Sequence, residues 1–299
     1  MEPSPDNGTL ATLWARQNVW SAAAGQLKRR ITRARVTGLS LAALGALLGT
    51  ASATFVGWWP EFARWLAVAA ALVLTALPLL ARAAGPATVQ DWTKTRAVSE
   101  ALKAEIYAYL AGAGPYRRDD PITELIRRTE EVVVGNDSLA RVTAGIEPTA
   151  RTLPEVKDVR SYAAVRVQGQ IERYYRPAAT RVHQRLTRFT RIEVGLTWLA
   201  AALASITGIQ PTWRLTALAA TLTTIAGAFA VHVAAERLEY QELTFSGTAD
   251  RLGFLLMRYA EAAPADATDD AFVEDCELVI ATENQAWMAK QTAEPRPGQ

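Results

Sequence analysis

The stretch that decides the fold is Thr37 to Trp59, TGLSLAALGALLGTASATFVGWW, in which no residue is charged. At a rise of roughly 1.5 Å per residue, a helix over this stretch is long enough to cross a hydrocarbon core of about 30 Å. Residues 65–81, 194–213 and 215–232 are similarly free of Asp, Glu, Lys and Arg. The sequence therefore predicts an all-α membrane protein with four transmembrane helices.

Average composition hides this pattern. The 299 residues are 50% hydrophobic and 21% charged, with a net charge of +2, and the mean hydropathy is +0.03. These values are typical of a soluble protein, in which the Ala-rich runs would be buried core helices. We favour membrane spans because Trp58, Trp59, Trp65 and Trp213 lie at or near the edges of the runs, as interfacial tryptophans do. The small net charge argues against nucleic acid as a partner.

A cleaved signal peptide is not expected at the N-terminus. The first apolar run begins only near residue 37 and is followed closely by a second. It is also longer than the apolar region of a signal peptide.

Charge placement predicts how the four runs cross the membrane. They pair into two hairpins with short turns, and each turn carries one arginine, Arg64 or Arg214. Basic residues concentrate before the first and third runs, so both termini and the long central segment are expected in the cytoplasm of a bacterium, with the spans in its inner membrane. The residues expected to set this topology or to contact lipid headgroups are Arg29, Arg30, Arg33, Arg35, Arg185, Arg188 and Arg191.

An internal repeat relates the two halves of the chain. Residues 28–33, KRRITR, align with residues 183–188, HQRLTR, and the same shift places Trp20 over Tyr175. Each half enters the membrane from the same side, which predicts a parallel repeat of two hairpins with long cytoplasmic helices. We predict a first two-span repeat at 1–134 (spans about 37–59 and 65–81), a linker at 135–157, and a second repeat at 158–299 (spans about 194–213 and 215–232).

Small residues recur at every fourth position in the first and third runs, and such faces let helices approach closely in lipid. The candidates for a helix-packing or pore seam are Gly45, Gly49, Ala53, Gly57, Ala200, Ala204 and Gly208. Packing inside each hairpin is the favoured alternative to an oligomer seam. Hydroxyls that would line a pathway are those of Thr216, Thr221, Thr223 and Thr224, although threonine in a helix also bonds its own carbonyls. Pro78 should bend the second span.

The sequence offers little chemistry. No Asp, Glu, Lys, Arg or His lies deep in a span, which argues against proton relays, coupled transport and voltage sensing. It also contains no phosphate-binding loop, dinucleotide fingerprint, zinc-protease motif or nucleophile elbow. With a single cysteine, Cys276, and two histidines, we expect no catalytic residue, no metal site and no cofactor. The chain is not expected to be an enzyme.

Five residues carry a resemblance to a known family. They are an aromatic before each pair of spans (Trp20, Tyr175), Tyr109 in the helix after the first pair, and Glu283 with Trp287 in a closing acidic helix. This layout resembles the SLATT domains, two-transmembrane domains associated with nucleotide-generating and nucleotide-sensing proteins of bacterial conflict systems. Both halves are covered, so the chain resembles a tandem arrangement. The first half departs from the pattern, because its acidic helix lacks the terminal Glu-xxx-Trp.

The resemblance implies a pore-forming or channel-like effector in antiviral defence by abortive infection. Such an effector would be a homo-oligomer among membrane lipids, triggered by a separate nucleotide-sensing or nucleotide-generating protein. Two alternatives remain open. One is a membrane-anchored helical scaffold that recruits cytoplasmic partners, and the other is a constitutive ion channel.

Overall fold

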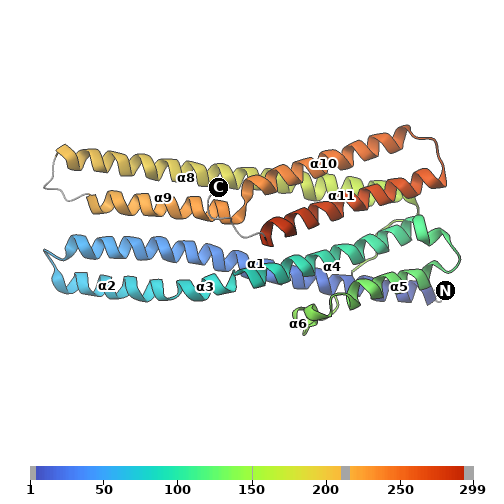
Figure 1. Cartoon of the computed structure of the whole chain (residues 1–299), viewed down its shortest axis with the longest axis horizontal. Helices are drawn as coiled ribbons and strands as arrows, with labels where there is room; N and C mark the ends of the chain where they lie inside the picture. Colours follow the sequence, from blue (N-terminus) through green and yellow to red (C-terminus); the bar gives the residue numbers. More distant parts are fainter. Residues whose placement is uncertain (1–4, 150, 210–215, 293–299) are drawn as a thin grey trace. The chain divides into compact units, whose positions relative to one another are not determined.

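The fold is helical throughout. The computed structural model describes residues 5–149, 151–209 and 216–292. The chain is 88% helical, and the described residues contain no strand (Figure 1). Within the described ranges, four helical runs are long and apolar enough to cross a membrane. The predicted all-α membrane fold is therefore confirmed.

The apolar runs lie in α1 (Pro5–Phe55), α2 (Pro60–Thr75) with α3 (Leu77–Ala83), α8 (Arg176–Ile209) and α9 (Thr216–Glu236). Pro60 opens α2 at a position where the backbone N–H that proline lacks would have no helical acceptor. The second apolar run is interrupted at Ala76, two residues before Pro78, because a proline inside a helix removes a hydrogen bond and clashes with the preceding turn. The predicted limits of the third and fourth spans fall in 210–215, outside the described residues.

The polar helices are α4 (Pro86–Ala111), α5 (Pro121–Val134), α10 (Leu238–Glu261) and α11 (Asp266–Thr292). Shorter turns connect them: η1 (Gly114–Arg117), η2 (Asp137–Leu139), α6 (Ala140–Thr143) and α7 (Val159–Tyr162). Two π-helical segments, η3 (Ala163–Gln168) and η4 (Ile171–Tyr175), precede α8. After α4, Gly112 takes a φ of 62°, a left-handed conformation that glycine adopts readily and that ends the helix.

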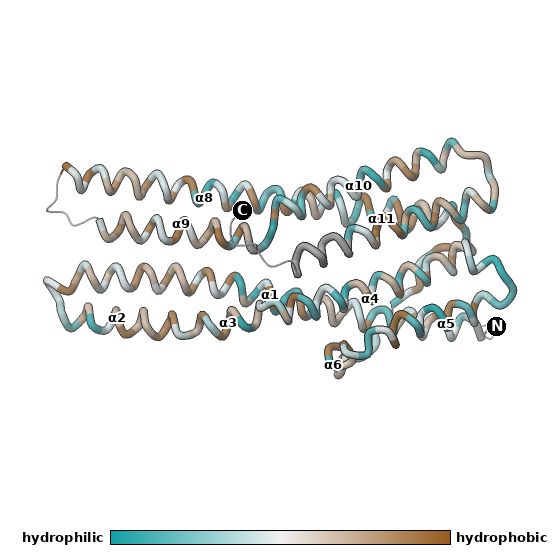
Figure 2. The backbone as a smooth tube through the Cα atoms, viewed as in Figure 1, coloured by the Kyte–Doolittle hydropathy of each residue, from teal (hydrophilic) through white to brown (hydrophobic). Residues whose placement is uncertain are grey.

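The chain divides into two compact units, which do not follow its two sequence halves. The body unit contains Met1–Arg29, Pro86–Ala179 and Leu243–Gln299, and the membrane unit contains Arg30–Gly85 and Thr180–Glu242. Each unit therefore draws segments from both halves. Hydropathy follows the same division (Figure 2). Apolar residues are dense along α2, α3 and α9, whereas in α4, α5 and α10 apolar and polar residues are interspersed. The internal repeat and the pairing of the spans into hairpins stay predictions.

The body unit has a conventional buried core. One cluster contains Leu10, Trp14, Ile106, Tyr116 and Leu125, and a second contains Trp20, Val98, Leu102 and Leu139. Both clusters join the first part of α1 to α4 and to the region from α5 to η2. Burial of these large side chains supplies the main favourable free energy for this unit.

The membrane unit exposes large apolar side chains. Trp65 is 71% exposed, Leu72 67% and Ile209 80%. A surface of this kind is unfavourable in water and is what contact with lipid requires. The soluble interpretation, in which these runs are buried core helices, is therefore wrong for the described residues.

Candidate functional site

The centre of the body unit holds a buried arginine, Arg166, which is 2% exposed. Its Nε and Nη2 donate to Oε1 and Oε2 of Glu277 on α11, at 3.0 and 2.9 Å. Tyr162 donates its hydroxyl to the same Glu277 Oε1 at 2.9 Å, and the guanidinium lies 4.8 Å from the centre of the Tyr107 ring. Burial would lower the pKa of Arg166, but the charge and hydrogen bonds of Glu277, together with the charge of Glu100, outweigh burial and raise that pKa. Arg166 is thus a permanently charged side chain that is held by hydrogen bonds to a carboxylate.

A second arginine extends the cluster along α4. Arg96 donates to the Tyr174 hydroxyl at 2.9 Å and lies 3.6 Å from Glu283 Oε2. Glu100, one turn further, accepts from Lys103 at 2.8 Å and lies 3.8 Å from Arg166 Nη2. Burial would raise the pKa of Glu100, but Lys103 and Arg166 outweigh it and lower the pKa to about 2. We call these six residues the charge cluster: Arg96, Glu100, Lys103, Arg166, Glu277 and Glu283.

The π-helical segments position one wall of the charge cluster. They carry Arg166, Tyr174 and Tyr175, and Gln170 lies between them. π-Turns are frequent at functional sites. A cavity of about 130 Å³ lies here, lined by Arg96, Glu100, Lys103, Gln170, Tyr174, Tyr175 and Ile280. Three members of the charge cluster, Arg96, Glu100 and Lys103, line this cavity directly.

The two glutamates that α11 contributes differ in their surroundings. Glu277 accepts three hydrogen bonds, from Arg166 and Tyr162. Glu283 is 4% exposed, and its Oε2 accepts no hydrogen bond. Burial raises the pKa of Glu283, and the charge of Arg96 only partly opposes this effect. Both oxygens of Glu277 are therefore paired, whereas the burial of Glu283 disfavours its charged form.

The N-terminal end of α11 is held by a second, more exposed group of ion pairs. Arg117 of η1 contacts Asp270 at 2.8 Å, Asp266 at 3.1 Å and Asp269 at 3.5 Å, and the Gly114 N–H donates to Asp270 Oδ1 at 2.7 Å. The single cysteine, Cys276, lies on the same helix and is buried. Burial raises the pKa of its thiol, which makes it a poor nucleophile.

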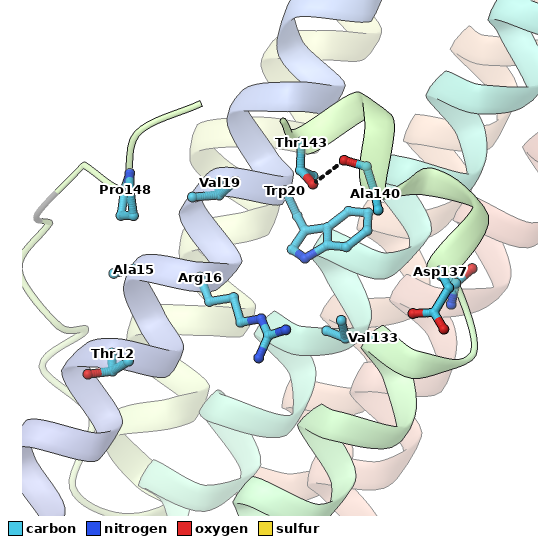
Figure 3. A pocket seen from close by; sticks show the side chains of 11 residues that line it. Thr12, Ala15, Arg16, Val19, Trp20, Val133, Asp137, Ala140, Thr143 and Pro148 are labelled. Carbon is cyan, nitrogen blue, oxygen red and sulfur yellow. Dashed lines mark hydrogen bonds between the residues drawn. The ribbon is translucent and has the colours of Figure 1, made fainter. Parts of the chain in front are cut away.

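A groove of about 490 Å³ lies on the other side of the core, between the first part of α1 and the segment from α5 to α6. Its apolar lining comprises Ala15, Val19, Trp20, Val133, Ala140 and Pro148. Two charged side chains, Arg16 and Asp137, also line it, and Figure 3 shows them approaching the groove from different elements. The described residues include no group of His, Cys, Asp and Glu that could hold a metal ion.

In the membrane unit, the predicted seam residues divide between buried and exposed positions. A Cβ on Gly45 would lie 2.6 Å from Leu74 Cδ2, so Gly45 packs directly against α2. Ala200 is also buried. The remaining candidates are exposed, and a Cβ on Gly49 or Gly208 would meet nothing within 4 Å; the exposed ones are Gly49, Ala53, Gly57, Ala204 and Gly208.

The predicted pathway threonines lie on two faces of α9. Thr221 is buried and its hydroxyl contacts that of Thr50 on α1, whereas Thr216, Thr223 and Thr224 are exposed. The hydroxyls of Thr221, Thr223 and Thr224 each donate to the carbonyl four residues earlier, at 2.8 to 3.0 Å. These bonds satisfy the hydroxyl hydrogen within the helix and leave the oxygen lone pairs of the exposed residues accessible.

The predicted topology arginines are exposed, with one exception. Arg35 lies 3.1 Å from Glu236, and the two side chains are 21% and 14% exposed. This partly buried pair joins α1 to the end of α9 in the membrane unit. The exposed members are Arg29, Arg30, Arg33, Arg185, Arg188 and Arg191.

The residues that carry the family resemblance gather in the body unit. Trp20 and Tyr175 are 5% and 1% exposed, Tyr109 packs edge-on against Tyr116 at 5.7 Å between ring centres, and Glu283 faces Arg96. Trp287 belongs to α11, but its side chain lies outside the described residues. The residues that carry the family resemblance therefore lie at positions where side chains pack in the body unit.

The charge cluster itself was missed at the sequence level, apart from Glu283. The sequence does contain a feature that indicates this cluster, which is a charged residue on the apolar face of its own helix. Arg166 follows buried Tyr162 by four residues, and Glu277 follows buried Val273 by four, spacings that place each pair on one face.

Two family models match the chain. Residues 162–287 match SLATT_1, described as SMODS and SLOG-associating 2TM effector domain 1, and residues 18–123 match DUF4231, a protein family of unknown function. Each match encloses two of the four apolar runs. No curated protein and no solved structure matches the chain. The second match is to a different model, so the tandem SLATT arrangement stays a prediction.

Proposed function

We propose, from the premise that this is a SLATT-containing membrane protein, that it is a channel-forming effector of the bacterial inner membrane. Its copies assemble so that the exposed face of α9 lines the pathway. The concentration of arginine before α1 and α8 enter their apolar runs favours cytoplasmic termini. The description of the matched domain favours a separate nucleotide-generating or nucleotide-sensing protein as the source of the trigger, in a defence that stops the growth of an infected cell.

The observation that carries the proposal is the composition of the exposed face of α9. Thr216, Ala220, Thr223, Thr224 and Gly227 are all exposed and share one face at helical spacing. A lipid-facing surface is normally rich in large apolar side chains, as on α2, where Trp65 and Leu72 are exposed. The small hydroxyl-bearing face of α9 is better suited to a neighbouring helix or to water.

We assign the pathway to the surface between copies because the face of α9 that packs inside the membrane unit is buried. The opposite face of α9 is buried and mainly apolar, with Ala219, Ile225 and Ala226 each less than 9% exposed. The hydroxyl of Thr221, on that face, is already in contact with Thr50. Exposed Gly49 and Ala53 on α1 would let neighbouring copies approach closely.

Membrane permeability tests the proposal directly. The protein would be expressed with a candidate trigger protein in a bacterial host, with a potential-sensitive dye as the readout, and also reconstituted in liposomes for ion flux. We expect the double variant Thr223→Val, Thr224→Val to reduce flux, because it removes two hydroxyls and keeps the side-chain shape, and Ser at both positions to restore it. Thr75→Val is the matched control, since Thr75 is exposed on α2 and its hydroxyl likewise bonds its own helix at 2.6 Å.

Equal flux from the wild type and the α9 double variant, at equal insertion, would remove α9 from the pathway. An unchanged potential with retained recruitment of cytoplasmic proteins would instead favour the membrane-anchored scaffold. Flux without any trigger would favour a constitutive channel.

A further inference from the structure

The groove beside Trp20 has the size and lining of a small-molecule site. Its volume of about 490 Å³ lies within the range of roughly 300–1,000 Å³ typical of such sites. Its lining includes two small side chains, Ala15 on α1 and Ala140 on α6, and the indole of Trp20 (Figure 3). The wall is rigid, since Trp20 is 5% exposed and packs in the core with Val98 and Leu102.

Two side chains of opposite charge line the groove without pairing with each other. Arg16 and Asp137 both line it, yet neither makes a salt bridge or a side-chain hydrogen bond with any described residue. Arg96, Arg117 and Arg166, in the same unit, are all held by carboxylates. The separation of Arg16 from Asp137 exceeds ion-pair distance, so a ligand can reach each charge without breaking a pair.

We propose that this groove binds a small zwitterion with an apolar body, of the amino-acid type. The anionic group of the ligand accepts hydrogen bonds from the Arg16 guanidinium, and its ammonium donates to the Asp137 carboxylate. The apolar body lies against Val19, Trp20 and Val133. A guanidinium suits a carboxylate because it offers paired donors in one plane, and the neighbouring ammonium and carboxylate of an amino acid complement the two opposite charges that line the groove.

Three fluorinated probes of one shape separate the contributions of the two charges. They are para-trifluoromethyl-phenylalanine, the related propionate without the amine, and the related phenethylamine without the carboxylate. Fluorine NMR would follow each probe with the full chain in nanodiscs, with empty nanodiscs as the control for partition into lipid. We expect the zwitterion to bind most tightly and the amine least.

Variants then assign the site. Arg16→Gln should weaken the zwitterion and the propionate by about tenfold, while Asp137→Asn should weaken only the probes that carry an amine. Ala15→Leu should exclude all three by filling the groove. The matched controls are Arg118→Gln and Ala11→Leu, both exposed in the body unit but outside the groove, and both should bind as the wild type does.

Three results would overturn the inference. The first is no binding above empty nanodiscs, and the second is equal binding by the wild type and Ala15→Leu. The third is a fluorine signal that changes with protein concentration and not with probe concentration. That result would indicate that the groove is covered by a second copy of the chain. The measurement requires no ion flux, so its outcome is independent of the channel proposal.

Discussion

Replacing Glu277 by glutamine should destabilise the body unit by about 3 kcal/mol or more, the usual range for breaking a buried ion pair. The amide retains the shape, and its oxygen can still accept from Tyr162 and from Arg166 Nε. Arg166 Nη2, however, meets an NH₂ donor in place of Oε2, its acceptor at 2.9 Å, and the negative charge that pairs with the guanidinium is lost. The nearest remaining carboxylate is Glu100, 3.8 Å away and already paired with Lys103. Because Arg166 is 2% exposed, water cannot replace the lost partner.

Thermal unfolding of the purified protein, followed by hydrogen exchange in peptides of the body unit, measures the effect. For a unit of this size each kcal/mol moves the midpoint by roughly 2–4 °C, so we expect a fall of roughly 10 °C. Hydrogen exchange assigns the change to the body unit, since the membrane unit is stabilised separately by lipid.

Glu283→Gln is the matched control on the same helix. Glu283 is also buried beside an arginine, but its Oε2 accepts no hydrogen bond and burial raises its pKa. A neutral amide there should leave the midpoint unchanged or raise it. The reasoning would be refuted if the Glu277 and Glu283 variants had unfolding free energies that agree within about 1 kcal/mol. Replacing Arg166 by Met together with Glu277 by Leu should recover most of the loss, because no unpaired charge remains.

Acid should weaken the body unit through Glu100, whose pKa is lowered from 4.5 to about 2 in the folded state. Its ion pairs contribute about 3 kcal/mol above the unfolded pKa, and this contribution disappears as the pH falls from about 5 to about 2; urea unfolding at several pH values would show it, and Glu100→Gln should remove it. Gly45→Leu should disrupt the membrane unit because Leu74 occupies the space, whereas Gly49→Leu should insert and melt normally; membrane insertion and unfolding midpoints distinguish them. In a Cys276→Ser background, a cysteine at Glu61 should react with an impermeant reagent in intact cells and one at Ala11 only after permeabilisation.

The apolar runs could be predicted from sequence because length and absence of charge are local properties. The run from Thr37 to Trp59 requires no knowledge of its neighbours, and the interruption near Pro78 follows from the geometry of proline. The direction that a residue faces is not local. Gly45 and Gly49 are equivalent by spacing, yet one meets Leu74 and the other open space.

The charge cluster could not be predicted with its partners, because its pairs are far apart in the chain. Arg166 and Glu277 are separated by 111 residues, and no local spacing connects them. The sequence does place Arg166 on the apolar stripe of its helix, where an unpaired charge would be too costly to bury. That rule predicts that a buried carboxylate must exist, although it does not say which one.

The two regions that match family models are interdependent within the body unit. Arg96 and Glu100 lie in the region 18–123, while their partners Glu283 and Arg166 lie in the region 162–287. A fragment of residues 1–145 would leave Arg96 and Glu100 without these partners, and a fragment of 146–299 would expose the other side of the same interface. We therefore expect each fragment alone to aggregate or be degraded and the two to copurify when coexpressed, with hydrogen-exchange protection of α4 restored. Stable, protected separate fragments would mean that the charge cluster does not hold the halves together.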